Sequence, residues 1–323
     1  MKIFVAGGAG YIGSCTTEYL LDKGHEVAVY DSLIRGHRAA VDNRAKFYQG
    51  DLEDLEFLKK AMQDFKPDYA LHFAAFIEVG ESMKDPGMFF HNNVGNAINL
   101  AEASAKAGVR KLVFSSTAAT YGMPEHIPMT EDEPTLPINP YGESKLMFEK
   151  ILAWYKKIYG MDYTALRYFN ACGATKLHGE DHHPETHLIP LVLQAAAGVR
   201  ESISVYGTDY DTPDGTCVRD YVHVLDLAQA HLLALEQPGS SIYNLGSGNG
   251  HSVMAVIDTV RRVTGKDFPV KYDEPRQGDP ARLISDSTKA RTMLGWKPAY
   301  ENLDEIVRSA WEWRLANPNG YKD

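Results

Sequence analysis

The chain has 323 residues, of which 44% are hydrophobic, enough to build the core of one large domain or of two closely packed ones. Its formal net charge of −10, with no local cluster of Lys and Arg, argues against nucleic acid as a partner. No apolar run approaches the roughly 20 residues that cross a bilayer, so no membrane partner is expected either. Three scattered cysteines form neither a metal-binding spacing nor an even disulfide framework, which favours a reduced, cytoplasmic setting.

The first half of the chain alternates between short apolar runs and longer segments with helical periodicity. Its first residues, MKIFVAGG, predict a buried strand that enters a glycine turn and not a signal peptide. Short apolar runs predict strands at residues 2–6, 26–30, 45–49, 69–73, 111–115 and 163–167. Helical periodicity predicts helices at residues 11–23, 55–65, 88–107 and 141–159. This alternation predicts an α/β fold with a doubly wound parallel sheet of the Rossmann type.

After about residue 171 the pattern loosens into loops rich in Gly, His, Asp and Pro. Periodicity predicts helices at residues 188–198 and 225–236, and strands at residues 204–206, 242–245 and 270–272. We therefore expect a Rossmann domain in residues 1–171. Residues 172–323 are expected to form mainly a smaller α/β C-terminal lobe that binds substrate, with some segments returning to the first domain.

Ligands of doubly wound sheets bind beyond the carboxyl ends of the strands. Several segments of this chain fall at or just past a predicted strand end, and they are residues 7–13, Asp31, Asp51, 73–75, 115–117 and 169–170. We expect these segments to line one crevice.

Gly7, Gly10 and Gly13 are spaced three apart in the turn between the first predicted strand and helix. Glycines let the backbone approach a pyrophosphate, and the helix N-terminus offers free N–H donors with a partial positive charge. Asp31 ends the second predicted strand, where a carboxylate can accept hydrogen bonds from an adenosine ribose. A 2′-phosphate would be repelled there, so the pattern predicts NAD and not NADP, even though two arginines follow closely in the chain.

Tyr141 and Lys145 lie one helical turn apart in the segment YGESK, so they share a face of the predicted helix. That face continues through Phe148 and Leu152, which indicates that it packs against a core. A cation this close to a phenol is expected to favour the phenolate and to lower its pKa from about 10. The pair therefore predicts a base that is active near neutral pH.

Eight motifs follow one another along nearly the whole chain, and they are GGAGYIGS, HFAAFIEVGES, FSSTAATYG, PYGESK, RYFNACGA, DGTCVRDYVHV, IYNLGSG and PRQGDPA. Through them the chain resembles the UDP-glucose 4-epimerases of the extended short-chain dehydrogenase/reductase superfamily. The glycine loop and the Tyr/Lys pair are specific only to the superfamily, whereas the later motifs narrow the resemblance to enzymes of nucleotide sugars. Members of the family hold NAD tightly, oxidise carbon 4 of a UDP-hexose to a ketone, and return the same hydride to the other face.

The resemblance implies that Tyr141 takes the proton of the O4 hydroxyl, that Lys145 assists it, and that Thr117 is the third catalytic group, where most members have Ser. It implies NAD contacts by Gly7, Gly10, Tyr11, Ile12, Gly13, Asp31, Ser32, Asp51, Leu52, Phe73, Ala74, Ala75, Asn92, Ser115, Tyr141, Lys145 and Phe169. It implies UDP-sugar contacts by Thr117, Asn170, His187, Ser204, Val205, Tyr206, Arg219, Tyr221, Arg276, Asp279 and Leu283. It also implies a homodimer, to which residues 100–107 and 146–155 would contribute.

Three positions depart from the family's pattern, Ile77, Cys15 and His187, and the size of a fourth residue, Leu283, bears on the sugar. Cys15 stands where His is usual, which is expected to change only the packing. Ile77 stands where some members place a Lys against the cofactor, so one charge-assisted contact is absent. His187 stands where an Asn that contacts the nucleotide is common. Leu283 aligns with a position that is Tyr in some members and smaller in others, unless the alignment slips by one residue to Arg282. A smaller residue leaves room for an N-acetyl group, so UDP-N-acetylglucosamine and UDP-N-acetylgalactosamine are expected as weaker substrates.

Two groups of histidines invite other interpretations. The segment GEDHHPETH holds three histidines and three carboxylates, yet adjacent histidines ligate one ion poorly and Pro184 breaks any helix that would align them. We therefore expect a solvated loop without a metal ion. His72, at the end of a predicted buried strand, is expected to be a core residue whose hydrogen bonds are satisfied.

Other activities remain to be weighed against the epimerase. A nucleotide-sugar dehydratase needs an acid/base pair directly after its catalytic Thr, and here Ala118 and Ala119 follow Thr117. A UDP-glucuronate 4-epimerase needs in addition only a group that binds the carboxylate of the sugar, so this activity remains an alternative. A non-enzymatic NAD-sensing module usually loses the catalytic Tyr, so the presence of Tyr141 and Lys145 argues against it.

Overall fold

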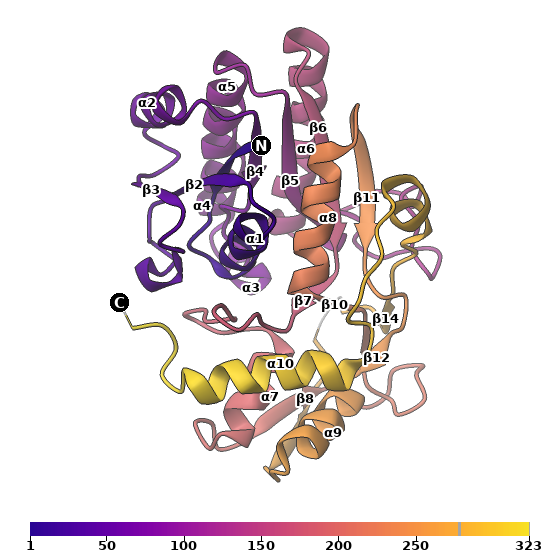
Figure 1. Cartoon of the computed structure of the whole chain (residues 1–323). Coiled ribbons are helices and arrows are strands. Elements are labelled where there is room, and N and C mark those ends of the chain that lie inside the picture. The colour runs from indigo at the N-terminus through magenta and orange to yellow at the C-terminus, as the bar shows by residue number, and fades with distance from the viewer. Residues whose placement is uncertain (277–278, 323) are drawn as a thin grey trace.

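The computed structural model describes residues 1–276 and 279–322, so two residues of the PRQGD motif, 277 and 278, lie outside it together with residue 323. A parallel sheet of seven strands forms its centre (Figure 1). In spatial order the strands are β11 (Ser241–Leu245), β6 (Asp162–Tyr168), β5 (Lys111–Thr117), β4 (Tyr69–His72), β1 (Lys2–Ala6), β2 (Glu26–Asp31) and β3 (Lys46–Gln49). The chain winds outward from β1 in both directions, so the switch in winding falls between β1 and β4.

Helices cover both faces of this sheet, as Figure 1 shows. One face carries α2 (Leu55–Phe65), α4 (Pro86–Phe90), α5 (Ala97–Lys106) and α6 (Pro140–Tyr159), and the other carries α1 (Tyr11–Asp22) and α8 (Val224–Glu236). The strands read as unbroken apolar runs because successive side chains enter different cores. In β1, Phe4 packs with one core and Ile3 and Val5 with the other.

The single long helix predicted at residues 88–107 is instead a continuous helical run from residue 86 to residue 106. Its middle, His91–Asn96, is π-helical and joins α4 to α5. A π-helical stretch widens the helix locally and is frequent at functional sites. Here it brings Asn93 to the crevice, as described below.

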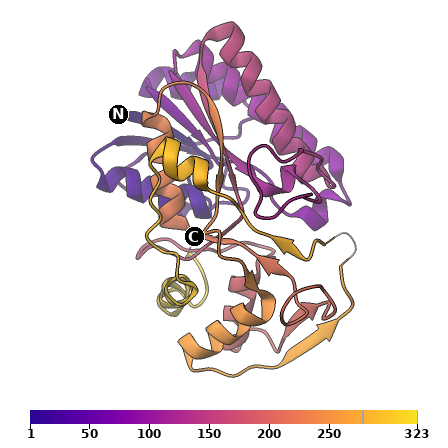
Figure 2. The same ribbon diagram turned by 90° about the vertical axis from the view of Figure 1, so that its right-hand side faces the viewer.

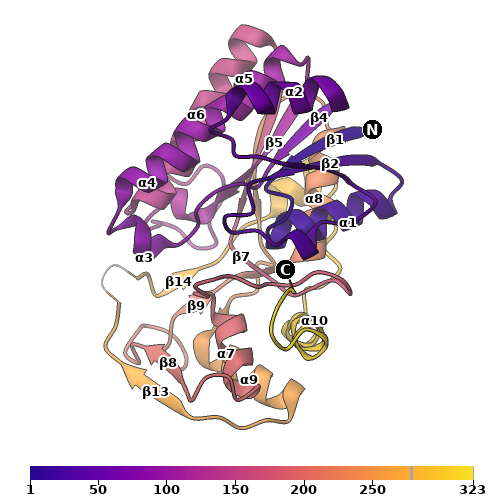
Figure 3. The same cartoon turned by 90° about the vertical axis from the view of Figure 1, so that its left-hand side faces the viewer.

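The second lobe lies beyond the edge of the sheet at which the strands end (Figures 2 and 3). Its helices are α7 (Leu188–Ala196), α9 (Val253–Thr264) and α10 (Leu303–Ala316), which share a core that includes Val192, Val260 and Val307. Short strands pair around them, and they are β7 (Asn170–Cys172) with β10 (Tyr221–His223), β8 (Ile203–Tyr206) with β13 (Val270–Asp273), and β12 (His251–Ser252) with β9 (Val218–Arg219) and β14 (Arg282–Leu283).

Between these lobe segments the chain returns to the sheet. α8 packs on the face that α1 covers, and β11 extends the sheet beyond β6, with Leu245 opposite Tyr168. The buried Trp296 holds its segment against α8, because its indole N–H donates to the backbone oxygen of Asp226 at 2.8 Å. Within the described residues no helix has the length and apolarity needed to cross a membrane.

Candidate active site

The turn from β1 into α1 leaves no space for a side chain at Gly7, in the loop, or at Gly13, in the first turn of α1. A Cβ on Gly7, whose φ is +82°, would lie 2.3 Å from the backbone N of Ala74. A Cβ on Gly13 would lie 2.1 Å from the backbone oxygen of Gly7. α1 begins at Tyr11 without a side-chain cap and with no acidic residue in its first turn. Its first N–H groups can therefore receive an anion such as a pyrophosphate, which fits the predicted dinucleotide.

Asp31 braces this loop from the end of β2. One carboxylate oxygen accepts the N–H of Ala9 and the other that of Leu33, each at 2.9 Å. Burial raises the pKa of Asp31, and these two hydrogen bonds counteract it. Each oxygen keeps a further lone pair, so the carboxylate can also accept ribose hydroxyls.

The two arginines after Asp31 are engaged elsewhere. Arg35 donates to the backbone oxygen of His183 at 2.8 Å and faces Glu78 at 3.4 Å. The guanidinium of Arg38 lies 4.6 Å from the ring centroid of Phe47. A 2′-phosphate would compete with Glu78 and the His183 backbone for Arg35, whereas stacking on Phe47 leaves the N–H groups of Arg38 able to donate.

The remaining predicted cofactor residues lie at the same edge of the sheet. They follow β2 (Ser32), β3 (Asp51, Leu52), β4 (Phe73, Ala74, Ala75) and β6 (Phe169), or lie on α1 (Ile12), in the π-helical stretch (Asn92) and in β5 (Ser115). The structure therefore brings the predicted set together, whereas their contacts with a cofactor stay a prediction.

Lys145 and Tyr141 lie on the first turns of α6, which Asn139 caps by accepting the N–H of Gly142 at 2.8 Å. The Lys145 ammonium donates to the backbone oxygen of Ser115 at 2.9 Å and lies 5.8 Å from the ring centroid of Tyr141. Only 3% of Lys145 is exposed, and this burial lowers its pKa to about 7. Near neutral pH its charge is therefore only partly retained.

The pKa of Tyr141 is shifted in the opposite direction from the one expected. Burial raises its pKa to about 12, a hydrogen bond with Thr117 counteracts this, and the nearby carboxylate of Glu78 adds to the increase. The prediction that Lys145 lowers this pKa is wrong for the chain's own groups, because burial weakens the phenolate and the ammonium alike. A base active at neutral pH needs additional positive charge at this place.

Asn93 supports the catalytic turn from the π-helical stretch. Its side chain accepts the N–H of Phe76 and donates to the oxygen of the same residue, both at 2.9 Å. It also donates to the Ser144 hydroxyl at 3.2 Å, and that hydroxyl donates to the backbone oxygen of Tyr141 at 2.7 Å. The buried Asn93 therefore links the loop after β4 to the start of α6.

Glu78, only 9% exposed, was not singled out in the sequence. It is paired with Arg35 across the glycine loop, because β2 and β4 lie on either side of β1. The signal that could have found it is a charged residue directly after Ile77, inside a motif whose neighbours are apolar.

Seven of the predicted substrate residues lie in three places. Asn170 donates its side-chain amide to the backbone oxygen of Asp220 at 2.7 Å. Arg219 forms an ion pair with Asp279, and β9 pairs it with Leu283 on β14. The guanidinium of Arg276 lies 4.1 Å from the ring centroid of Tyr206, and Ser204 lies on the same strand, β8.

Two predicted substrate residues are core residues. Val205 is 1% and Tyr221 4% exposed, and both pack in the core of the second lobe. Their side chains are therefore turned away from a ligand, and at most their backbone could reach one. His187 lies at the start of α7, where its imidazole bonds to Glu180 at 2.5 Å. Burial would lower the pKa of His187, but the neighbouring carboxylates raise it to about 9.

His72 differs in one respect from the expectation. It is buried between Phe114 and Phe148, with ring centroids 5.4 Å from each. Among the described residues, however, its Nδ1 has no hydrogen-bond partner, so it is not a satisfied core histidine. Burial lowers its pKa to about 3, and the ammonium of Lys145 contributes to this.

This arrangement defines a dinucleotide-dependent enzyme with a Tyr/Lys pair, and comparisons with known proteins identify its family. Residues 3–246 match the NAD dependent epimerase/dehydratase family, and the chain belongs to it. The UDP-glucose 4-epimerase of Lacticaseibacillus casei is 52% identical over 100% of this chain and 99% of its own. This confirms the resemblance predicted from the motifs.

Solved structures agree. The UDP-glucose 4-epimerase of Bifidobacterium longum, in complex with NAD⁺ and UDP, is 37% identical with a TM-score of 0.95 and covers 99% of this chain and 100% of its own. The UDP-Glc/GlcNAc 4-epimerase of Campylobacter jejuni is 41% identical with a TM-score of 0.86, covering 98% of this chain and 99% of its own.

Proposed function

We propose that the protein interconverts UDP-glucose and UDP-galactose by inverting carbon 4, with NAD held in the crevice of the sheet. The observation that carries the proposal is the placement of Tyr141, Lys145 and Thr117 at the edge where the glycine loop and Asp31 also lie. Full-length similarity to UDP-glucose 4-epimerases supports it.

When bound, NAD supplies the acceptor and donor of the hydride at carbon 4. The closely packed glycines and the uncapped start of α1 would hold its pyrophosphate, and Asp31 its adenosine ribose. Lys145 would donate to the nicotinamide ribose. NAD is favoured over NADP because Asp31 repels a 2′-phosphate and Arg35 is engaged by Glu78 and the backbone of His183.

Tyr141 would take the proton of the O4 hydroxyl while the hydride leaves carbon 4. After the keto sugar has rotated in the site, Tyr141 would return the proton to O4. With a pKa of about 12 from the chain's own groups, Tyr141 is protonated at neutral pH. The phenolate therefore depends on the positive charge of the oxidised nicotinamide and on a charged Lys145. Thr117 would hydrogen-bond the same oxygen and keep it aligned with Tyr141.

The direct test is mass spectrometry of the small molecules that the purified protein releases on denaturation. We expect about one NAD per chain, together with a UDP-hexose, and epimerase activity without added nucleotide. Protein that purifies empty and prefers NADP in titration would contradict the role given to Asp31.

We further propose that N-acetylated UDP-sugars are weaker substrates, because Leu283 is smaller than the Tyr of some relatives. Leu283 lies on β14 beside Arg219, at the place where the diphosphate is expected. Packing of the acetyl methyl on leucine is worth about 1 kcal/mol. The assay compares both sugar pairs and UDP-glucuronate in the wild type and in Leu283→Tyr. A wild type that ignores the N-acetyl pair, or a variant that keeps it unchanged, excludes this role, and a preference for UDP-glucuronate selects the alternative activity.

We also propose a homodimer through the outer face of α6, in a cytoplasmic setting that fits three free, buried cysteines. Met147, Trp154 and Ile158 share one side of the helix and are 37%, 58% and 66% exposed. Leu146 and Leu152, expected at the interface, are instead buried within the chain itself. Light scattering should give a dimer mass for the wild type and a monomer mass for Trp154→Glu. A monomeric wild type would contradict this.

A further inference from the structure

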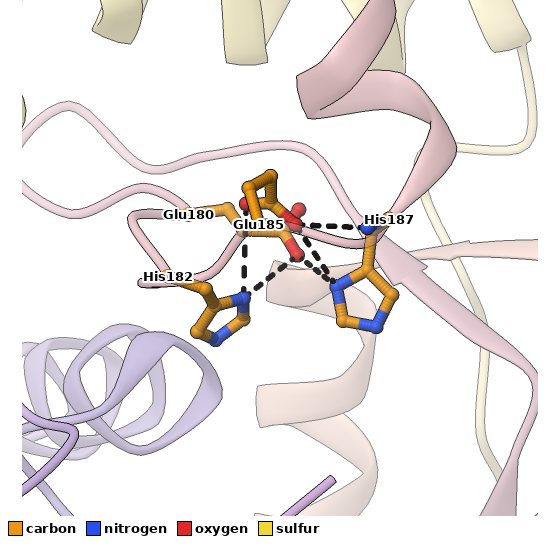
Figure 4. Close-up of side chains that lie close together, drawn as sticks. All are labelled: Glu180, His182, Glu185 and His187. Carbon is orange, nitrogen blue, oxygen red and sulfur yellow. Dashed lines mark hydrogen bonds and ion pairs between the residues drawn. The ribbon is translucent and has the colours of Figure 1, made fainter. Parts of the chain in front are cut away.

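The loop between β7 and α7 brings four potential metal ligands to one point. Glu180, His182, Glu185 and His187 each direct a ligand atom at the others, and all four atoms lie within 4.8 Å of one another (Figure 4). Glu180 Oε1 lies 2.5 Å from His187 Nδ1 and 3.3 Å from His182 Nδ1. Glu185 lies 3.8 Å from His182 Nδ1 and 3.7 Å from His187 Nδ1.

These separations suit a four-coordinate ion. Ligand atoms about 2.0–2.1 Å from a tetrahedral Zn²⁺ lie about 3.3 Å from one another. Three of the four carboxylate–imidazole separations fall at 3.3–3.8 Å, with Glu185 facing His182 through Oε2 and His187 through Oε1. To surround one ion, Glu180 and His187 would move apart by less than about 1 Å, and any pair near the 4.8 Å limit of the cluster would move closer. Imidazole nitrogens and carboxylate oxygens are ligands that Zn²⁺ and similar divalent transition metals accept.

A divalent cation is also compatible with the charge of the cluster, where it would replace the proton between His187 and Glu180 as the counter-charge. The side chains of Glu180 and Glu185 are each only 7% exposed. Among the described residues neither carboxylate forms an ion pair with Lys or Arg, so the two imidazoles are the groups that face these buried carboxylates. His182 Nδ1 is buried and lacks a hydrogen bond within the described chain, although it faces both carboxylates.

We propose that Glu180, His182, Glu185 and His187 form a binding site for one divalent transition-metal ion of the Zn²⁺ type. The sequence argued against a metal on two grounds, the adjacent histidines and Pro184. In the structure only His182 of the adjacent pair faces the cluster, and a folded loop, not a helix, brings the four side chains together. His183 has a side chain that is 78% exposed and faces Asp181 at 3.5 Å, so it takes no part in the cluster.

The position of the cluster indicates a bracing role. The ring of His182 lies edge-on to Tyr11, the first residue of α1, with centroids 6.1 Å apart. Arg35 from the loop after β2 donates to the backbone oxygen of His183, and His187 precedes the first residue of α7. An ion here ties the cofactor-binding edge of the sheet to the first helix of the second lobe.

The test uses the full-length protein, treated with chelator and titrated with ZnCl₂ by calorimetry and with Co²⁺ by visible absorbance. We expect one equivalent per chain, Co²⁺ bands of four-coordinate intensity, and a Tm about 4 °C higher when zinc is present at about 100 times its Kd. His182→Gln and Glu185→Gln should abolish the tight equivalent and the Tm shift, whereas the matched control His183→Gln should retain both.

Circular dichroism of each chelator-treated variant separates loss of the site from loss of the fold. If a variant is unfolded, the wild type alone still decides, since chelator must lower its Tm and zinc must restore it. The proposal is overturned if the wild type binds no stoichiometric metal. It is equally overturned if folded His182→Gln binds as tightly as the wild type, or if His183→Gln removes the binding.

Discussion

Two buried ionisable side chains, Lys145 and Glu149, lie one turn apart on α6 but differ in the number of partners around them. Glu149 is matched by Arg167, which donates to its two oxygens at 3.0 and 2.5 Å, and by the hydroxyl of Ser116. Lys145 is as deeply buried, but among the described residues its ammonium has one hydrogen bond, to the backbone oxygen of Ser115. The first charge is compensated within the protein, whereas the second is not.

The difference separates a structural charge from a reactive one. Burial lowers the pKa of Lys145 to about 7 and raises that of its neighbour Tyr141 to about 12. Groups shifted so far by burial and placed in a crevice are typical of catalytic sites. A ligand that brings positive charge favours the phenolate of Tyr141, whereas hydrogen-bond acceptors on a ligand favour the ammonium of Lys145.

The largest expected effect follows from removing the reactive hydroxyl. Tyr141→Phe should reduce kcat by a factor of about 10² to 10⁴, the usual contribution of one positioned acid/base group, while NAD stays bound. Steady-state assays and the NAD content of the purified variant check this together. Full activity in the variant would remove Tyr141 from the mechanism.

On the structural side of the comparison, Glu149→Gln should lower the free energy of unfolding by about 3–5 kcal/mol, because it leaves Arg167 buried without its partner. The double variant Glu149→Leu with Arg167→Met should recover much of this stability. Urea unfolding at matched NAD content measures both. The comparison fails if the single variant keeps its stability but loses its catalytic rate.

A third uncompensated group, His72, predicts how stability depends on pH. Its pKa in the folded protein, about 3, lies below its unfolded value of about 6.5, so only the unfolded chain takes up the proton as the pH falls. Between pH 7 and about pH 5 this costs about 2 kcal/mol, a loss that His72→Phe should not show. Urea unfolding at both pH values measures this. Equal losses of unfolding free energy in the wild type and the variant would mean that His72 is already protonated in the folded protein, which would contradict the prediction.

The smallest effect sharpens the account of Tyr141. Glu78→Gln removes a negative charge that raises the pKa of Tyr141, so the rising limb of kcat/KM against pH should move to lower pH by about half a unit. Glu81→Gln is the matched control, because Glu81 is paired with Lys84 on the surface. An unchanged profile in Glu78→Gln would show that Glu78 does not act on the base.

Most strands of the central sheet could be predicted because a strand that is buried on both faces has an unbroken run of apolar residues in its sequence. The second lobe was harder to predict from the sequence. Strands of two residues, such as β9 and β14, carry no periodic signal of their own. The helices α9 and α10 were missed although Ser252 and Asn302 cap them and apolar residues recur one turn apart.

The gathering of the predicted site residues at one edge of the sheet could be predicted from the sequence, but the pKa shifts of these residues could not. The spacing of Tyr141 and Lys145 predicts that they share a helical face, yet only the fold shows that Lys145 is buried and that Tyr141 is partly buried beside it. For the same reason the expected pKa shift of Tyr141 had the wrong direction. The cluster around Glu180 and His187 depends on how one loop folds back on itself, which residue spacing does not reveal.

The central claim is that the chain oxidises carbon 4 and returns the same hydride to the opposite face. Its most direct test is to convert UDP-galactose that carries deuterium at carbon 4, in ordinary water without added nucleotide, and to examine the product by NMR and mass spectrometry. We predict UDP-glucose that keeps the deuterium at carbon 4. Product with hydrogen from solvent at that carbon, or no UDP-glucose at all, would contradict the account.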